Sequence, residues 1–142
     1  MSEFAMNKVV FAYDGEEDAF PPLNPGVRPL GSRVLVQVRA AKKKTKGGII
    51  LAGETRDTEQ WNTQVAKVRE VGPLAYHNRN SMEPWPEGAW CKVGDYVRCP
   101  KYGGDRWSVL DEHGDEVIFV LFNDLDIIGL VDGDPLAMKA FL

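Results

Sequence analysis

The chain has 142 residues, of which 44% are hydrophobic, and this length suits one compact domain with a modest core. Its 17 basic and 21 acidic residues give a net charge of -4 at pH 7, which argues against a general nucleic-acid binder, because phosphate contacts need a clustered excess of cations. The charge is unevenly placed, because residues 1–25 hold five acidic residues and one basic residue and so carry the net acidity of the chain.

Residues 1–25 are predicted to form an acidic extension that is an appendage of the domain. The extension ends in a run of prolines, which remove backbone donors and hold the chain extended, so we expect the body of the domain to begin near Val27. The pattern then alternates over residues 33–38, with Val34, Val36 and Val38 on one face. This alternation predicts a half-buried strand.

The stretch 39–61 is polar except for the run Gly-Gly-Ile-Ile-Leu at residues 47–51. One interpretation is an exposed loop that buries its apolar triplet in a partner, since each aliphatic side chain is worth roughly 1.5 to 3 kcal/mol when buried and the glycines leave the backbone free to adapt. The other is a turn followed by the start of a core strand. The scarcity of apolar neighbours favours the loop.

Residues 65–71 carry three valines spaced by three, which would also suit a helix. Their β-branched side chains and the Gly-Pro pair that follows favour a strand with a bulge instead. Residues 73–92 are rich in proline, asparagine and large aromatic side chains. This composition predicts a long loop or an irregular hairpin with aromatic anchors.

The remainder of the chain is predicted to be short strands and turns. We expect a strand at 96–99, a hairpin of 106–110 with 116–122, a short helical turn at 123–126 and a final strand at 127–131. No long helix, repeat or heptad appears. Many short strands separated by glycine-rich turns indicate an all-β fold, a small β-barrel.

Motifs for catalysis, metal binding or nucleotide binding are absent from the sequence. The two histidines, His77 and His113, belong to no spacing typical of a nucleophile, base or metal ligand. Cys91 and Cys99 form no CxxC pair, and the glycine pairs match neither the phosphate loop nor the dinucleotide fingerprint. We therefore expect a protein that is not an enzyme and binds no cofactor or metal.

The longest apolar run, residues 117–122, is far too short to span a bilayer. No apolar leader segment follows a basic start. We therefore expect a soluble, cytoplasmic protein.

Six short blocks of this sequence resemble, in the same order, the GroES-type co-chaperonins, the small lids of chaperonin cages. Each block alone is weak, but chance rarely supplies six in order, and together they cover residues 26–131. The blocks are Arg28-Pro29-Leu30 with Arg33-Val34-Leu35-Val36, then Gly47-Gly48-Ile49-Ile50-Leu51, residues 68–72, Lys92-Val93-Gly94-Asp95-Tyr96-Val97, Tyr102-Gly103-Gly104, and Glu116-Val117-Ile118 with residues 123–128.

The resemblance implies a Greek-key barrel that assembles into a heptameric ring, with the first and last strands making contacts between neighbours. It implies that residues 47–51 are the family's mobile loop and dock into an apolar groove of a GroEL-type chaperonin. The lid would close a chamber in which client proteins fold, in a cycle driven by ATP that the chaperonin binds. The segment between Gly72 and Lys92 would be the roof hairpin, with Tyr76 as a dome aromatic.

The chain departs from this family in three places: the extension 1–25, the aromatic-rich segment 73–92 and the tail 132–142. These departures make it longer than the usual member. They suit a virus-encoded version that acts in the host cytoplasm and adapts a host chaperonin to large viral clients.

Two rival readings come from other classes of protein. The chain could be a nucleic-acid-binding barrel, with the lysines of residues 42–46 on phosphates and Trp61, Trp85 or Trp90 stacked on bases. Alternatively, it could be an assembly protein that keeps the barrel and has lost the chaperonin contact.

Overall fold

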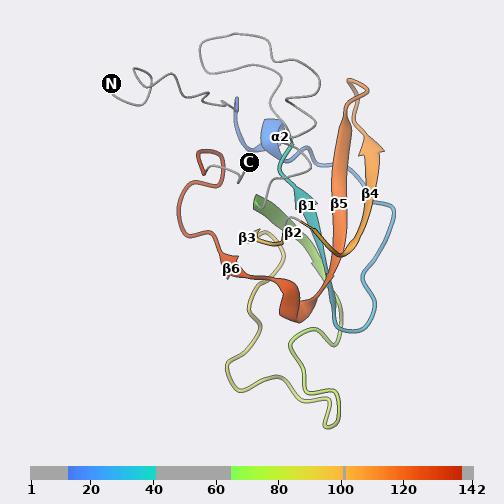
Figure 1. Cartoon of the computed structure of the whole chain (residues 1–142), viewed down its shortest axis with the longest axis vertical. Coiled ribbons are helices and arrows are strands. Elements are labelled where there is room, and N and C mark those ends of the chain that lie inside the picture. The colour runs from blue at the N-terminus through green and yellow to red at the C-terminus, as the bar shows by residue number, and fades with distance from the viewer. Residues whose placement is uncertain (1–12, 41–64, 101, 139–142) are drawn as a thin grey trace.

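The computed structural model describes residues 13–40, 65–100 and 102–138, shown in colour in Figure 1. The regular secondary structure of the described part is almost entirely β-strand. Its elements in chain order are α2 (Glu16–Ala19), β1 (Arg33–Val38), β2 (Val65–Val71), β3 (Tyr96–Arg98), β4 (Asp105–Leu110), β5 (Glu116–Asn123), the 3-10 turn η1 (Asp124–Asp126) and β6 (Gly129–Leu130).

The six strands form one antiparallel sheet in the order β4-β5-β1-β2-β3-β6. The all-β prediction is therefore confirmed, with β1 at the centre of the sheet (Figure 1). Within the described residues the sheet does not close, and β4 and β6 are its two edges. The final strand is shorter than expected, because β6 pairs with β3 through only two residues.

The bulge predicted between residues 65 and 71 is present in β2. Leu35 of β1 lies opposite Glu70, whereas the next residue, Val36, lies opposite Val68. Arg69 is therefore the extra residue of the bulged strand. The bulge explains why the valines of β2 are spaced by three although the segment is a strand.

The main core lies on one face of the sheet, where Val34, Val36 and Val38 of β1 project as predicted. Side chains from β2, β3 and β5 complete this core, together with residues that come from the loops. The loop residues are Ala75, Tyr76, Cys91, Cys99 and Ile127.

The expectation that β1 is half-buried is wrong, because its second face is covered as well. Leu35 is fully buried in a smaller apolar cluster, and Gln37 is 1% exposed. The cover is the segment before β1, since Gln37 Nε2 donates to the carbonyl oxygen of Pro21 at 2.8 Å. A sequence pattern could not show this second layer, because alternation records side-chain polarity and not what packs on the polar face.

The N-terminal extension is not an appendage over its described part. Arg69 Nη2 donates to the carbonyl oxygen of Leu23 at 2.7 Å, and Trp107 Nε1 donates to that of Pro25 at 2.8 Å. Ala19 and Phe20 are buried together with Val65 of β2. Residues 13–25 thus pack along the outer face of the sheet and at one end of it.

Candidate functional site

The predicted docking residues, Gly47, Gly48, Ile49, Ile50 and Leu51, lie outside the described residues. The structure does describe the residues on either side of the segment that contains them. Arg39 and Ala40 follow β1, and Val65 begins β2. We call these three residues the loop root.

The loop root lies where two neighbouring strands of the sheet end and begin. Val38 of β1 pairs with Ala66 of β2, and the backbone N–H of Arg39 donates to the carbonyl oxygen of Val65 at 3.0 Å. Segment 41–64 therefore connects the end of one strand to the start of the adjacent strand.

The N-terminal segment holds one side of the loop root. The backbone N–H of Ala40 donates to the carbonyl oxygen of Ala19 at 2.8 Å, and the hydroxyl of Tyr13 donates to the carbonyl oxygen of Ala40 at 2.6 Å. Both backbone polar groups of Ala40 are thus hydrogen-bonded to residues 13–19.

The C-terminal segment meets the same root through a buried cation. Arg39 is 2% exposed, and its Nη1 donates to the carbonyl oxygens of Pro135, at 2.9 Å, and of Met138. The guanidinium also lies over the ring of Tyr13, 5.3 Å from its centroid. Such contacts offset part of the cost of burying the charge. Arg39 thereby joins segments from the two ends of the chain.

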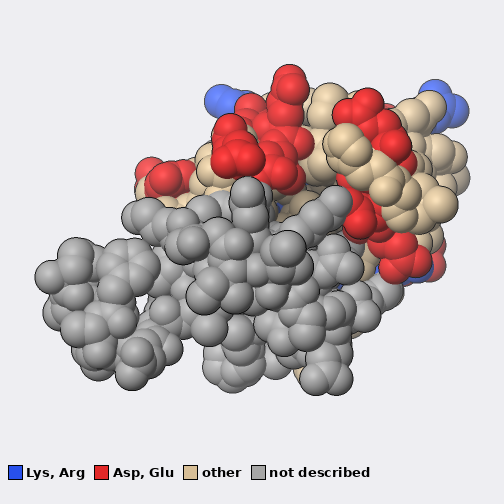
Figure 2. Space-filling view, turned by 90° about the horizontal axis from the view of Figure 1, so that it is seen from above, with Lys and Arg blue, Asp and Glu red and all other residues tan. Residues whose placement is uncertain are grey.

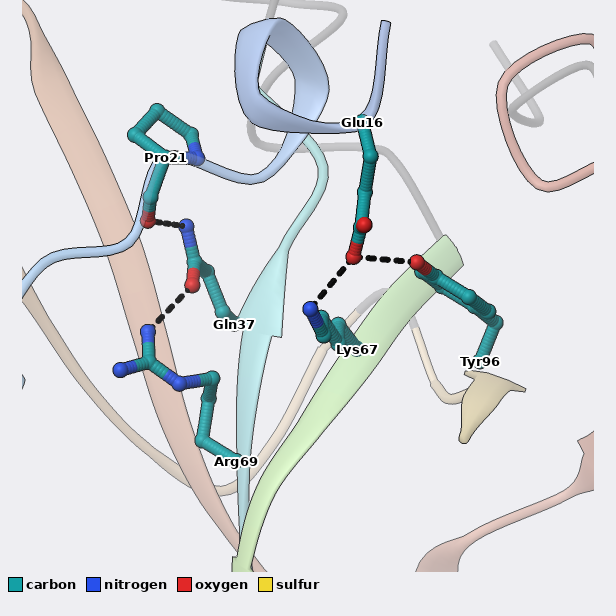
Figure 3. Close-up of polar contacts among 6 residues, drawn as sticks. All are labelled: Glu16, Pro21, Gln37, Lys67, Arg69 and Tyr96. Atoms are coloured by element: carbon teal, nitrogen blue, oxygen red, sulfur yellow. Dashed lines mark hydrogen bonds and ion pairs between the residues drawn. The ribbon is translucent and has the colours of Figure 1, made fainter. Parts of the chain in front are cut away.

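A polar cluster fixes α2 on the sheet beside the root (Figure 3). Oε1 of Glu16 accepts hydrogen bonds from Lys67 Nζ and from the hydroxyl of Tyr96. The bond from Lys67 and then that from Tyr96 lower the pKa of Glu16. Burial, followed by the bond to Glu16, raises the pKa of Tyr96 to about 12. At neutral pH the carboxyl group of Glu16 is therefore anionic and the phenol of Tyr96 is neutral.

Acidic side chains gather on the end of the molecule that carries the loop root. Figure 2 views this end and shows Asp and Glu residues over its described surface, with few Lys or Arg residues. The first turn of α2 supplies Glu16, Glu17 and Asp18. The β4–β5 hairpin tip, with its acidic turn, points to the same end (Figure 1). This charge disfavours a phosphate-binding surface on the described part of that end.

The segment between β2 and β3 lies at the opposite end of the sheet from the loop root (Figure 1). It is an irregular loop, as predicted, with one isolated bridge between His77 and Pro84. Met82, near its tip, is 53% exposed.

Tyr76, the aromatic that the resemblance assigns to the roof, is buried in this segment. Its side chain is 1% exposed and packs against Trp85 and Trp90, with ring centroids 5.3 and 5.5 Å away. The hydrophobic effect accounts for this burial, because Tyr76 belongs to the main core and the partly buried Trp85 and Trp90 pack against it. Tyr76 is therefore an anchor of the segment.

Asp124 of η1 secures this anchor, although it lies 48 residues away in the sequence. Tyr76 has a φ of 61°, a left-handed conformation that is costly for a residue with a side chain. The backbone N–H of Tyr76 donates to Asp124 Oδ2 at 2.8 Å, and its hydroxyl donates to the carbonyl oxygen of Asp124 at 3.0 Å. These bonds hold the strained conformation in place.

The described residues offer no obvious reactive centre. Cys91 and Cys99 are free and buried, and burial raises the pKa of Cys91 and that of Cys99, the latter to about 12. Thiols of this kind are poorly reactive. Within residues 13–40, 65–100 and 102–138, no group of three or more His, Cys, Asp or Glu residues could hold a metal ion. The helices of this same part are all too short to cross a membrane.

The chain also matches the model of a known protein family. The family model of Cpn10, described as "Chaperonin 10 Kd subunit", matches residues 26–131, well over half of the chain. The chain belongs to the Cpn10 family. The resemblance to GroES-type co-chaperonins is therefore confirmed, and with it the general function of a co-chaperonin, a folding helper.

Several residues that build this Cpn10 family member's site could not be assigned from the sequence. Arg39 stands at the start of a polar stretch, and nothing local shows that the C-terminal segment covers it. Glu16 is one of several acidic residues in the extension, and only the fold brings it to Lys67. Asp124 was part of a predicted turn, but its partner Tyr76 is distant in the chain.

We predict that Asp124→Ala lowers the free energy of unfolding by about 1.5 to 3 kcal/mol. The substitution removes the carboxylate that accepts the N–H of Tyr76, a buried residue, and a hydrogen bond to a charged group is worth about 1.5 to 3 kcal/mol. Asp126→Ala, in the same turn but on an exposed residue, is the control and should cost less than about 0.5 kcal/mol. Urea denaturation measures both, and equal losses would show that Asp124 does not anchor the segment.

A second prediction concerns the pH dependence of the Glu16 cluster. The pKa of Glu16 is lowered in the folded protein, so its stabilisation is present above about pH 4.5 and is lost as the pH falls through the lowered value. Glu16→Gln should therefore lower the melting temperature at pH 7, by the small amount expected of an exposed ion pair worth about 1 kcal/mol or less. At pH 3 the two proteins should melt closer together, and an equal difference at both pH values would refute the assignment.

Proposed function

We propose that this protein caps a GroEL-type chaperonin through residues 47–51 in an ATP-dependent cycle and so assists the folding of enclosed client proteins. The observation that carries this proposal is the Cpn10 match over residues 26–131, which includes the Gly-Gly-Ile-Ile-Leu run. ATP is assigned to the chaperonin, because the chain carries no nucleotide-binding motif. We place this activity in the cytoplasm. For a virus-encoded member, this would be the cytoplasm of the host cell.

The placement of the described elements supports this function. Segment 41–64 starts and ends at one end of the sheet, and segment 73–92 lies at the other end (Figure 1). One end would then face the chaperonin while the other covers the chamber. The clustered Tyr76, Trp85 and Trp90 would brace the covering segment instead of contacting clients.

We propose a heptameric ring as the working assembly. The described sheet is open, and an edge strand offers unpaired backbone groups that a neighbouring copy can complete. At one edge, Leu130 of β6 is 50% exposed, and Ile128 and Leu125 just before it are 64% and 63% exposed. Burying such side chains against a second copy would be favourable.

The ring also solves an energetic problem of docking. Ordering a loop costs about 1 to 2 kcal/mol per residue, which offsets much of the roughly 1.5 to 3 kcal/mol gained from each of three aliphatic side chains. One segment alone should therefore bind weakly. Linking several copies raises avidity by roughly 100-fold or more without new contacts, and each contact remains weak enough to release.

The nucleic-acid reading is less well supported. Trp85 and Trp90 pack against Tyr76 and each other, with 5.4 Å between the centroids of the two tryptophans, so part of their surface is used within the protein. Base stacking requires a free aromatic face. Asp and Glu residues predominate on the described surface that is visible at this end of the molecule (Figure 2). Tight, salt-sensitive binding to single-stranded nucleic acid would nevertheless restore this reading.

The docking role predicts the effect of Ile50→Asp. This change should reduce binding to the chaperonin in the presence of ATP by at least about 100-fold, because an apolar contact is replaced by a desolvated charge repeated in every copy. Ring assembly and the melting temperature should stay the same. Interferometry with immobilised chaperonin measures the affinity.

The matched control for this prediction is Val93→Asp, which places the same charge on a side chain that is 63% exposed in the turn before β3. It should bind as the wild type does. If Ile50→Asp instead lowers stability by several kcal/mol, residues 49–51 are part of a core strand and the docking role fails.

A further inference from the structure

The two terminal segments of the chain meet at the loop root, and both lie outside the region that the family model matches. Residues 13–20 precede residue 26 and residues 134–138 follow residue 131. They share one apolar cluster, in which Ala19, Phe20 and Val65 are buried and Tyr13, Tyr96, Leu136 and Met138 pack around them. We call these two segments the collar.

The contacts of the collar are directed at the ends of segment 41–64. On the outgoing side, Ala40 is hydrogen-bonded through both its N–H and its carbonyl group to residues 19 and 13. On the returning side, Val65 is fully buried in one cluster with Phe20, whose ring lies 5.3 Å from that of Tyr96. Arg39 binds the backbone of Pro135 and Met138 between them.

Polar bonds further along the sheet also hold the N-terminal segment in position. Figure 3 shows Glu16 reaching Lys67 and Tyr96, and Gln37 reaching Pro21 and Arg69. Lys67 and Arg69 both belong to β2, the strand that returns from segment 41–64. The N-terminal segment is therefore tied to that strand as well as to Ala40.

We propose that the collar fixes both ends of segment 41–64 on the sheet and thereby sets how tightly this segment docks on the chaperonin, with Tyr13 and Glu16 as positioning residues. The inference rests on the proposed function. Strand ends fray when few contacts hold them, and each frayed residue must be ordered again on docking. A fixed root removes that cost in advance, as preorganisation does in other complexes.

The test is the double variant Tyr13→Phe with Glu16→Gln, which removes one hydroxyl and one charge while keeping both side-chain shapes. Amide exchange at Ala40 should become about tenfold faster or more in the free protein, because its N–H is bonded to Ala19 within the collar. Affinity for a bacterial chaperonin with ATP should fall about fivefold or more per docking segment. The double variant should still assemble into the same ring as the wild type, and it should melt at nearly the same temperature.

The control is Glu17→Gln, which removes the same charge from an exposed position of the same helix. It should change neither the exchange at Ala40 nor the affinity. Faster exchange at Ala40 with unchanged affinity would overturn the proposal, and so would unchanged exchange in the double variant. A loss of affinity that only follows a large loss of stability would show a structural role instead.

The same measurements separate this inference from the proposed function. If wild-type protein does not bind the chaperonin at all, the proposed function fails and the docking part of the inference fails with it. Exchange at Ala40 in the wild type and the double variant still decides whether the collar fixes the loop root.

Discussion

The burial of β1 on both faces is the constraint on which the rest of the structure depends. This central strand pairs with β2 on one side and β5 on the other, and one of its faces forms the main core. Its second face would expose Leu35 and Gln37 to water without the cover of residues 20–25. The N-terminal extension is therefore part of the fold, because it supplies the layer that a single curved sheet lacks.

This second layer also connects stability with function. The same N-terminal segment that covers β1 is also hydrogen-bonded, through Ala19, to Ala40. At Ala40 the strand has ended and segment 41–64 begins. The C-terminal segment reaches the same point through the buried Arg39. Contacts that complete the fold thus also define where the segment assigned to docking is attached. Changes in the two terminal segments could therefore alter partner binding without touching the docking residues.

Local patterns predicted most strands of this protein because their signals are local. Alternation in residues 33–38 and turn residues between 110 and 116 placed β1 and the β4–β5 hairpin, and β-branched valines with a Gly-Pro stop indicated the bulged β2. The buried position of Tyr76 and the packing of residues 13–25 were missed. Both depend on contacts between distant parts of the chain, such as Tyr76 with Asp124, which no local pattern records. The docking residues were proposed from composition and family resemblance, and they lie outside the described part of the chain.

The central claim is that the protein is a lid that binds a chaperonin only in its nucleotide-bound state. Sedimentation of the purified protein, with and without a bacterial chaperonin and with and without ATP, tests it most directly. The account predicts a ring-sized species that co-sediments with the chaperonin only when ATP is present. A monomer, or an intact ring that ignores the chaperonin in ATP, would contradict it.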